Sequence, residues 1–331
     1  METTMKPYPS PRACATLAAL ILALQGAAAQ ADGPWPSKPV RVIMPFAAGG
    51  SSDLVGRQVA QSLSAHYGQQ FVAENRSGAG GNIGVDAVAK SAPDGYTLGI
   101  GTSGPLANNK SLYHPMPFDA EKDLTPIALV GEIPVVIAVN PSVKANTLAE
   151  FVALSKSSAN AVTVSNPGNG TIGHLATEYL SIQTGAKLQP VPYKGDSPAM
   201  VDAMSGSVSA VVAPVTSLIP NIQANKLRAL AVMSKTRFPG LPDVPTANEQ
   251  GVKLEATVWS AMVGPAGLPK SIVSSLNAEI NKYTASPEGK AKLNSLGMVP
   301  LSGTPEQLRE LMRNEATKWQ EVVKSARISI E

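Results

Sequence analysis

In the first third of the chain, short apolar runs alternate with longer amphipathic stretches. Residues 40–44, 71–74 and 96–101 form runs of the length and apolar content that buried strands have. Between them, residues 53–67 and 83–90 place apolar side chains at helical spacing. Strands that alternate with helices of these lengths predict right-handed βαβ units, and therefore an α/β protein whose sheets are mainly parallel.

The same order of strand, glycine turn and helix begins again near the middle of the chain. Residues 162–165 are expected to form a strand, residues 166–170 a turn, and residues 171–184 a helix. Further strands are expected at 127–130, 134–140, 189–192, 208–213, 227–233 and 258–263, and further helices at 147–158, 197–204, 215–224, 269–283, 288–296 and 306–325. The repeated order predicts a second lobe built like the first.

Two of the expected strands are placed to carry the chain between the lobes. The first crossing is expected within residues 134–140 and the return within residues 227–233. These crossings divide the chain into a first lobe of residues 32–136 and 234–331 and a second lobe of residues 137–233. Both lobes have the size of an ordinary domain.

The first 31 residues have the pattern of a secretory signal peptide. Basic residues precede an apolar run at 13–24, and small residues follow it, so cleavage after Ala29 or after Ala31 fits the pattern. The apolar run is shorter than the roughly 20 residues that a membrane-spanning helix needs. We therefore expect residues 1–31 to be removed and the mature protein to be exported.

Composition narrows the chemistry of the mature chain. The one cysteine, Cys14, lies in the expected signal peptide, which excludes disulfides, thiol catalysis and cysteine metal sites. Removing Lys6, Arg12 and Glu2 from 27 basic and 24 acidic residues leaves 25 and 23, a balance that does not indicate nucleic acid. Three isolated histidines predict no metal site, and the sequence has no nucleophile motif. We expect no catalytic residues and no cofactor.

Two glycine-rich turns are the strongest functional signals. In the first, Gly49 and Gly50 precede Ser51 and Asp53 at the start of a helix, so unpaired N–H groups and the positive end of the helix dipole face the turn. This turn alone fits an anion site and a plain βα connection equally well. The second turn, at 166–170, would face it across a cleft at the carboxyl ends of parallel strands, where α/β sheets bind ligands.

Two side chains near these turns have alternative interpretations. Asp53 caps its own helix or contacts the ligand, directly or through water. His174 lies in the first turn of the second helix, which disfavours its charged form, so it either donates a neutral N–H to a carboxylate or forms an exposed pair with Glu178. The sequence leaves both pairs of alternatives open.

A third glycine pattern lies at residues 99–104 and matches the dinucleotide fingerprint GxGxxG. Pro105 and the polar residues after it replace the long apolar helix that this fingerprint requires, so nucleotide binding is not expected. Thr102 and Ser103 are instead interpreted as hydroxyl groups that line the cleft at a strand end.

Motifs along nearly the whole mature chain resemble those of one family, the periplasmic solute-binding proteins of tripartite tricarboxylate transporters, also called Bug receptors. The motifs that carry the resemblance are Trp35-Pro36 through Pro45-Phe46 with Gly49-Gly50 and Asp53, Glu74-Asn75-Arg76 with Gly78-Ala79-Gly80-Gly81, Pro93-Asp94-Gly95-Tyr96-Thr97-Leu98, His174-Leu175-Ala176, Pro192-Tyr193-Lys194-Gly195, Leu227-Arg228-Ala229-Leu230-Ala231-Val232 and Pro242-Asp243-Val244-Pro245-Thr246. Together these motifs are highly specific.

The resemblance implies a two-lobe Venus flytrap fold of the type II-like class, no catalysis, and capture of a small carboxylate by a monomer that delivers it to the large and small integral components of a membrane transporter. It also implies that the two glycine turns grip one ligand carboxylate, partly through ordered water. Together with the strand ends, the candidate ligand-binding residues are Phe46, Ala47, Gly49, Gly50, Ser51, Asp53, Thr102, Ser103, Gly168, Asn169, Thr171, His174 and Pro214.

The chain departs from the family pattern at two places. The family often has an aromatic residue followed by Asp or Asn where this chain has Val212-Ala213-Pro214, and Asn225 replaces a usual glycine. The first departure lies at a strand end near the cleft and favours a more apolar pocket, such as one for an aromatic or alkyl acid. Dicarboxylates, tricarboxylates and amino acids stay open as ligands, as do a sensor role and the alternative of an exported α/β enzyme that acts on carboxylated molecules.

Overall fold

The computed structural model describes residues 35–46, 48–49, 51–193 and 195–328. Residues 38–331 form one compact unit, and the expected signal peptide lies outside the described residues. Within the described ranges, no helix is both long enough and apolar enough to cross a membrane.

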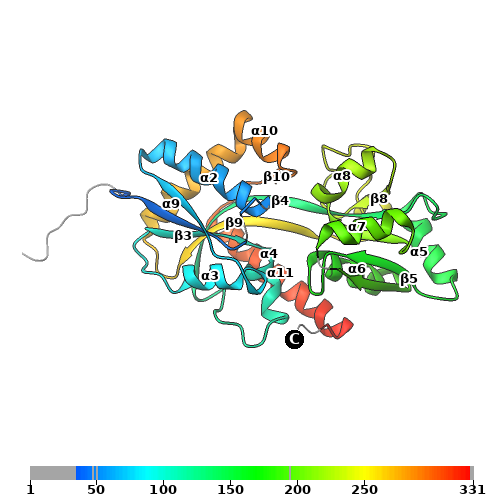
Figure 1. The fold of residues 1–331 in the computed structure, drawn as a ribbon. Helices are drawn as coiled ribbons and strands as arrows, with labels where there is room; N and C mark the ends of the chain where they lie inside the picture. Colours follow the sequence, from blue (N-terminus) through cyan, green and yellow to red (C-terminus); the bar gives the residue numbers. More distant parts are fainter. Residues whose placement is uncertain (1–34, 47, 50, 194, 329–331) are drawn as a thin grey trace, which may run out of the picture. The chain divides into compact units, whose positions relative to one another are not determined.

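One side of the unit is built on a mixed sheet (Figure 1). In this sheet three neighbouring strands are parallel, and the next two strands are antiparallel to each other. β1 lies between β2 and β3 and runs parallel to both, as expected from the βαβ pattern. β9 then runs antiparallel to β3 and to β4. The strands, in spatial order, are β2 (Phe71–Asn75), β1 (Val40–Met44), β3 (Thr97–Thr102), β9 (Thr257–Pro265) and β4 (Leu124–Val139), with β10 (Val299–Pro300) pairing β4.

β4 belongs to two sheets. Its longer first part pairs with β9 and β10, and its last part, from Val135 to Val139, pairs with β7 (Ala210–Pro214) and β8 (Arg228–Val232). The sequence pattern predicts two separate strands here because Gly131 and Pro134 interrupt the apolar run, but the structure has one strand of 16 residues. The interruption is absorbed by shifts of register against β9, between Pro126 and Ala128 and between Leu129 and Gly131.

The second sheet has the same parallel core as the first. β5 lies between β6 and β7 and runs parallel to both, β4 follows on the far side of β7, and β8 pairs with the other edge of β4. The remaining strands are β5 (Val162–Asn166), β6 (Leu188–Pro192), β7 (Ala210–Pro214) and β8 (Arg228–Val232). β8 pairs with the second half of β4, so the return to the first sheet comes later than the expected 227–233, at the start of β9.

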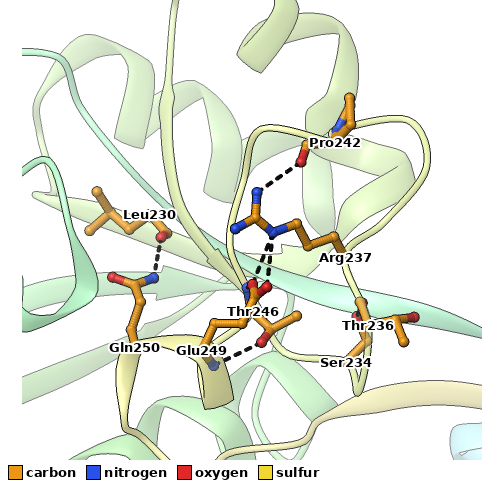
Figure 2. Close-up of polar contacts among 8 residues, drawn as sticks. All are labelled: Leu230, Ser234, Thr236, Arg237, Pro242, Thr246, Glu249 and Gln250. Atoms are coloured by element: carbon orange, nitrogen blue, oxygen red, sulfur yellow. Dashed lines mark hydrogen bonds and ion pairs between the residues drawn. The ribbon is translucent and has the colours of Figure 1, made fainter.

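The segment between β8 and β9 is fastened to the second sheet by side-chain hydrogen bonds (Figure 2). The carboxylate of Glu249 accepts the backbone N–H of Thr246 at 2.7 Å and the Nε–H of Arg237 at 3.0 Å, and the Thr246 hydroxyl accepts the N–H of Glu249 at 3.0 Å. The Gln250 amide donates to the carbonyl oxygen of Leu230 in β8 at 2.8 Å. The Gln250 bond joins the segment to β8, whereas the bonds of Glu249 hold the segment itself together.

Helices cover both sheets, and one of them joins the two cores. In helix α11, Leu308 and Met312 pack into the core of the first sheet, whereas Trp319, Val322 and Val323 pack into the core of the second. The helices are α2 (Ser51–Tyr67), α3 (Asn82–Ala89), α4 (Ser103–Leu106), α5 (Leu148–Ser157), α6 (Ile172–Thr184), α7 (Asp196–Ser205), α8 (Val215–Gln223), α9 (Lys270–Ala285), α10 (Pro287–Ser295) and α11 (Pro305–Ala326), with short 3₁₀ turns at Ala79–Gly81, Asn108–Ser111 and Asn248–Gln250.

Candidate functional site

A cavity of about 270 Å³ lies where the strand ends and turns of the two sheets meet. From the side of the first sheet it takes residues that follow β1 and β3, and from the second sheet residues that follow β5 and β7. Its described lining residues are Phe46, Gly80, Thr102, Ser103, Gly104, Asn108, Asn109, Tyr113, Pro167, Asn169, Gly170, Thr171, Ile172, Asp196, Pro214 and Val258. The carboxyl ends of parallel strands are the usual ligand site of α/β sheets, which singles out this cavity.

A larger hollow of about 650 Å³ is a weaker candidate. Its residues include Tyr179 on α6, Lys318 on α11 and Glu255 in the segment that precedes β9. None of its described residues follows the carboxyl end of a parallel strand. The smaller cavity is therefore the candidate site.

Six of the thirteen predicted residues line this cavity: Phe46, Thr102, Ser103, Asn169, Thr171 and Pro214. Gly49, Asp53, Gly168 and His174 lie in the two turns but are not among its lining residues. Ala47 and Gly50 lie outside the described residues, and Ser51 begins α2 with its side chain not described.

Asp53 fixes the first turn from behind. Its buried carboxylate accepts the N–H of Gly49 at 2.9 Å, the Nε–H of Arg57 at 3.0 Å and the amide of Asn75 at 2.7 Å. The same Asn75 amide donates to the carbonyl oxygen of Phe46 at 2.9 Å. Burial raises the pKa of Asp53, but the hydrogen bonds from Arg57, Gly49 and Asn75 outweigh it and hold this pKa below its ordinary value. Asp53 therefore ties the turn to α2 and β2.

His174 has the corresponding place behind the second turn. Its Nδ1 accepts the N–H of Gly170 at 3.0 Å, while the Thr171 hydroxyl donates to the carbonyl oxygen of Gly168 at 2.7 Å and caps α6. Burial lowers the pKa of His174, so the ring is neutral with its proton on Nε2, 3.8 Å from a carboxylate oxygen of Glu178. The imidazole is buried rather than in an exposed pair, and it positions the Gly170 amide at the cavity wall.

α6 starts unusually close to β7. A Cβ on Gly173 would lie 2.2 Å from the carbonyl oxygen of Val212, a distance that no side chain tolerates. Only glycine therefore lets the first turn of α6 lie against the end of β7, which brings Thr171 and Pro214 to one wall of the cavity.

The opposite wall contains residues that the sequence pattern does not reveal. Asn109 is buried, and its amide donates to the carbonyl oxygen of Gly80 at 3.1 Å and to the side-chain oxygen of Asn82 at 2.7 Å. A Cβ on Gly80 would lie 2.6 Å from the hydroxyl of Tyr113, so this wall is also closely packed. In the sequence, the polar pair Asn108-Asn109 counts against a nucleotide-binding helix after Pro105. The polar character of this pair is also the signal that could have assigned both asparagines to the cleft.

The cavity offers many donors and little charge. The hydroxyl groups of Thr102 and Ser103, the side-chain amide of Asn108 and backbone N–H groups at the helix starts suit an anionic oxygen, whereas the Thr171 hydroxyl and the Asn109 amide already donate within the protein. Asp196, at the start of α7, accepts the hydroxyl of Ser217 at 2.7 Å and brings one negative charge to the wall. Within the described ranges, no group of three or more His, Cys, Asp or Glu side chains could hold a metal ion.

Comparison with known proteins gives consistent matches over almost the whole chain. The family model described as the tripartite tricarboxylate transporter family receptor matches residues 55–328. Protein BugT of Bordetella pertussis is 37% identical over 308 residues, which cover 92% of this chain and 94% of that protein.

Two solved structures share both sequence and fold with this chain. An R. palustris protein with adipate is 34% identical, with a TM-score of 0.76 over 89% of this chain and 100% of that one. MatC from Rhodopseudomonas palustris with bound malate is 29% identical, with a TM-score of 0.71 over 87% of this chain and 100% of that one. These likenesses confirm the expected α/β fold class, with a mixed sheet flanked by helices.

Proposed function

Because this chain belongs to the tripartite tricarboxylate transporter receptor family, whose members are solute-binding receptors rather than enzymes, we propose that it captures a small carboxylate in the 270 Å³ cavity between its two sheets. The alternative of an exported enzyme is set aside on the same membership. The related proteins with adipate and malate support a carboxylate as the ligand class.

The observation that carries this proposal is that two turns, one after β1 and one after β5, meet at one cavity and are each held by a buried side chain. Asp53 and His174 occupy equivalent places, each accepting a backbone N–H of its turn from behind. The walls in front of them supply hydroxyl and amide donors without a described arginine or lysine. A carboxylate held by such neutral donors is stabilised by several hydrogen bonds of the charge-assisted kind.

We also propose that the protein closes around its ligand by a hinge between two lobes, residues 32–136 with 234–331 and residues 137–233. β4 is continuous through both sheets, and the chain returns at the start of β9, so two strands form the connection. Because the segment 234–256 and the end of α11 pack with the second core, we assign them to the second lobe for this motion, so that the first lobe resumes at the start of β9.

The proposed setting is the periplasm, after removal of residues 1–31. There the protein acts as a monomer and passes its ligand to integral membrane components of a transporter. The family match supports this setting, and the balanced charge of the chain gives no reason to expect a nucleic acid partner.

Thermal unfolding with a panel of acids tests the proposal: succinate, malate, adipate, citrate, benzoate and glutamate. A ligand at 100 times its dissociation constant stabilises the folded state by about 2.7 kcal/mol, which raises the melting temperature measurably. Thr171→Val should weaken binding of the acid found, since its hydroxyl holds the Gly168 carbonyl and caps α6 at the cavity wall, whereas Thr317→Val on the exposed face of α11 should not.

If no acid in an extended panel raises the melting temperature, the receptor proposal fails. Proton NMR of the bound and released acid provides the second readout. If the released acid is chemically altered, the protein is an enzyme rather than a receptor.

A further inference from the structure

The charge on the cavity wall is unexpected for a receptor of dianions. Of the described lining residues, Asp196 is the one acidic side chain. No described lysine, arginine or histidine is part of the lining. A ligand with carboxylates at both ends would bring one of them into the same small cavity as this aspartate.

Asp196 is held in place by its neighbour on α8. The Ser217 hydroxyl donates to Oδ2 at 2.7 Å, which leaves Oδ1 and further lone pairs of Oδ2 able to accept. In the described part of the chain no ion pair involves this carboxylate. An acidic residue in the first turn of a helix is favourable through the helix dipole wherever it points, so stability does not require that it lie at the cavity.

A second acceptor lies on the other wall. Asn108 is 3% exposed, lines the cavity, and its Oδ1 has no hydrogen-bond partner among the described residues. Buried polar atoms are nearly always paired in folded proteins. The cavity therefore offers two oxygen acceptors, one from each half of the molecule, beside the donors that suit a carboxylate.

We propose that the ligand is an amino acid, whose carboxylate is bound by the donors of the two turns and whose ammonium group is bound by Asp196. An ammonium has three N–H donors and a positive charge, so it satisfies the aspartate and still has donors for Asn108. This inference rests on the proposed function and specifies its ligand class. Asp196 is the residue that separates amino acids from dicarboxylates of the same length.

Isothermal titration calorimetry with matched ligands tests this assignment. At four, five and six carbons, the protein is titrated with the dicarboxylate, the α- and ω-amino acids, and the half-amide of the diacid. We expect the best amino acid to bind at least tenfold more tightly than the dicarboxylate of equal length. Asp196→Asn keeps the size and the acceptor for Ser217, and should shift that ratio by at least tenfold toward the dicarboxylate.

Asp202→Asn is the matched control, because it removes the same charge from the same helix but at a carboxylate bonded to Tyr193 and not in the cavity lining. It should leave the ratio unchanged. Asp196→Ser, which also begins helices well, replaces Asp196→Asn if that variant does not fold.

The outcomes separate the two proposals. If dicarboxylates bind and Asp196→Asn or Asp196→Ser shifts the ratio by less than tenfold, the amino acid assignment is overturned while the carboxylate receptor stands. Half-amides that bind as tightly as the amino acids overturn the ammonium in favour of an uncharged donor. If no acid of any class binds, the receptor proposal itself has failed.

Discussion

Gly173→Ala is the sharpest test of how the second turn is built. The added Cβ would lie 2.2 Å from the carbonyl oxygen of Val212 and 3.0 Å from Cδ of Pro167, whereas ordinary contacts begin at 3.4 Å. The start of α6 and the end of β7 must therefore separate by about 1.2 Å, the difference between 3.4 and 2.2 Å. The carbonyl of Val212 is backbone, and the position of an alanine Cβ is fixed by the backbone, so no side-chain rotation relieves the overlap.

The expected loss follows from two opposing terms. Overpacking of this kind costs about 3 kcal/mol at the upper end of its usual range, and alanine gains about 1 kcal/mol over glycine inside a helix. We expect the free energy of unfolding, measured by urea titration of tryptophan fluorescence, to fall by about 2 kcal/mol. Thr171 and Ile172 line the cavity directly before Gly173, so a shift beyond the tolerance of about 0.5 Å should also weaken ligand binding at least tenfold.

Gly56→Ala in α2 is the matched control. Its Cβ would also come too close to neighbours, at 2.4 Å from Sδ of Met44 and 2.9 Å from Cγ1 of Ile100, but these are side-chain atoms that can rotate away. It should cost less stability and leave binding unchanged. The reasoning is refuted if Gly173→Ala unfolds within about 0.5 kcal/mol of the wild type and binds with the same affinity.

Three further changes probe the supports of the site and the cores. His174→Asn keeps an acceptor for Gly170 but removes a group whose folded pKa lies below 6.5; the wild type should lose stability as pH falls from 6.5 toward that lowered pKa, and urea titrations of the variant should lack this loss. Asp53→Asn should cost about 1–3 kcal/mol at pH 7 and weaken binding by calorimetry; an unchanged affinity would contradict its role in the turn. Trp319→Ala should cost about 3–5 kcal/mol in urea unfolding, and a loss below 1 kcal/mol would argue against its place in the second core.

The sequence predicts local elements well because their signals are local. The helix expected at 171–184 is Ile172–Thr184, and the one expected at 53–67 is Ser51–Tyr67, since a capping residue and a glycine mark their ends. The strand ends that line the cavity follow from the same pattern, which is why Thr102 and Ser103 could be named in advance.

Partners that are distant in sequence could not be predicted in the same way. The hydrogen bond from Asn75 to Asp53 spans 22 positions, and the one from Asn109 to Asn82 spans 27. No periodic pattern in the sequence predicts either bond. The pairing of β8 with β4 likewise joins residues such as Val136 and Val232, which lie far apart in the sequence. The fold class was therefore accessible from sequence, whereas ten of the sixteen described residues that line the cavity were not.

The way α11 joins the two cores bears on the order in which the chain can fold. The core around β5 and α6 is completed by Trp319, Val322 and Val323, which are synthesised after every other buried residue of that core. The first core is likewise completed by Leu308 and Met312, at the start of the same helix. A nascent chain of this topology therefore buries neither core fully until α11 has been synthesised, a delay that keeps the chain unfolded for the export proposed above.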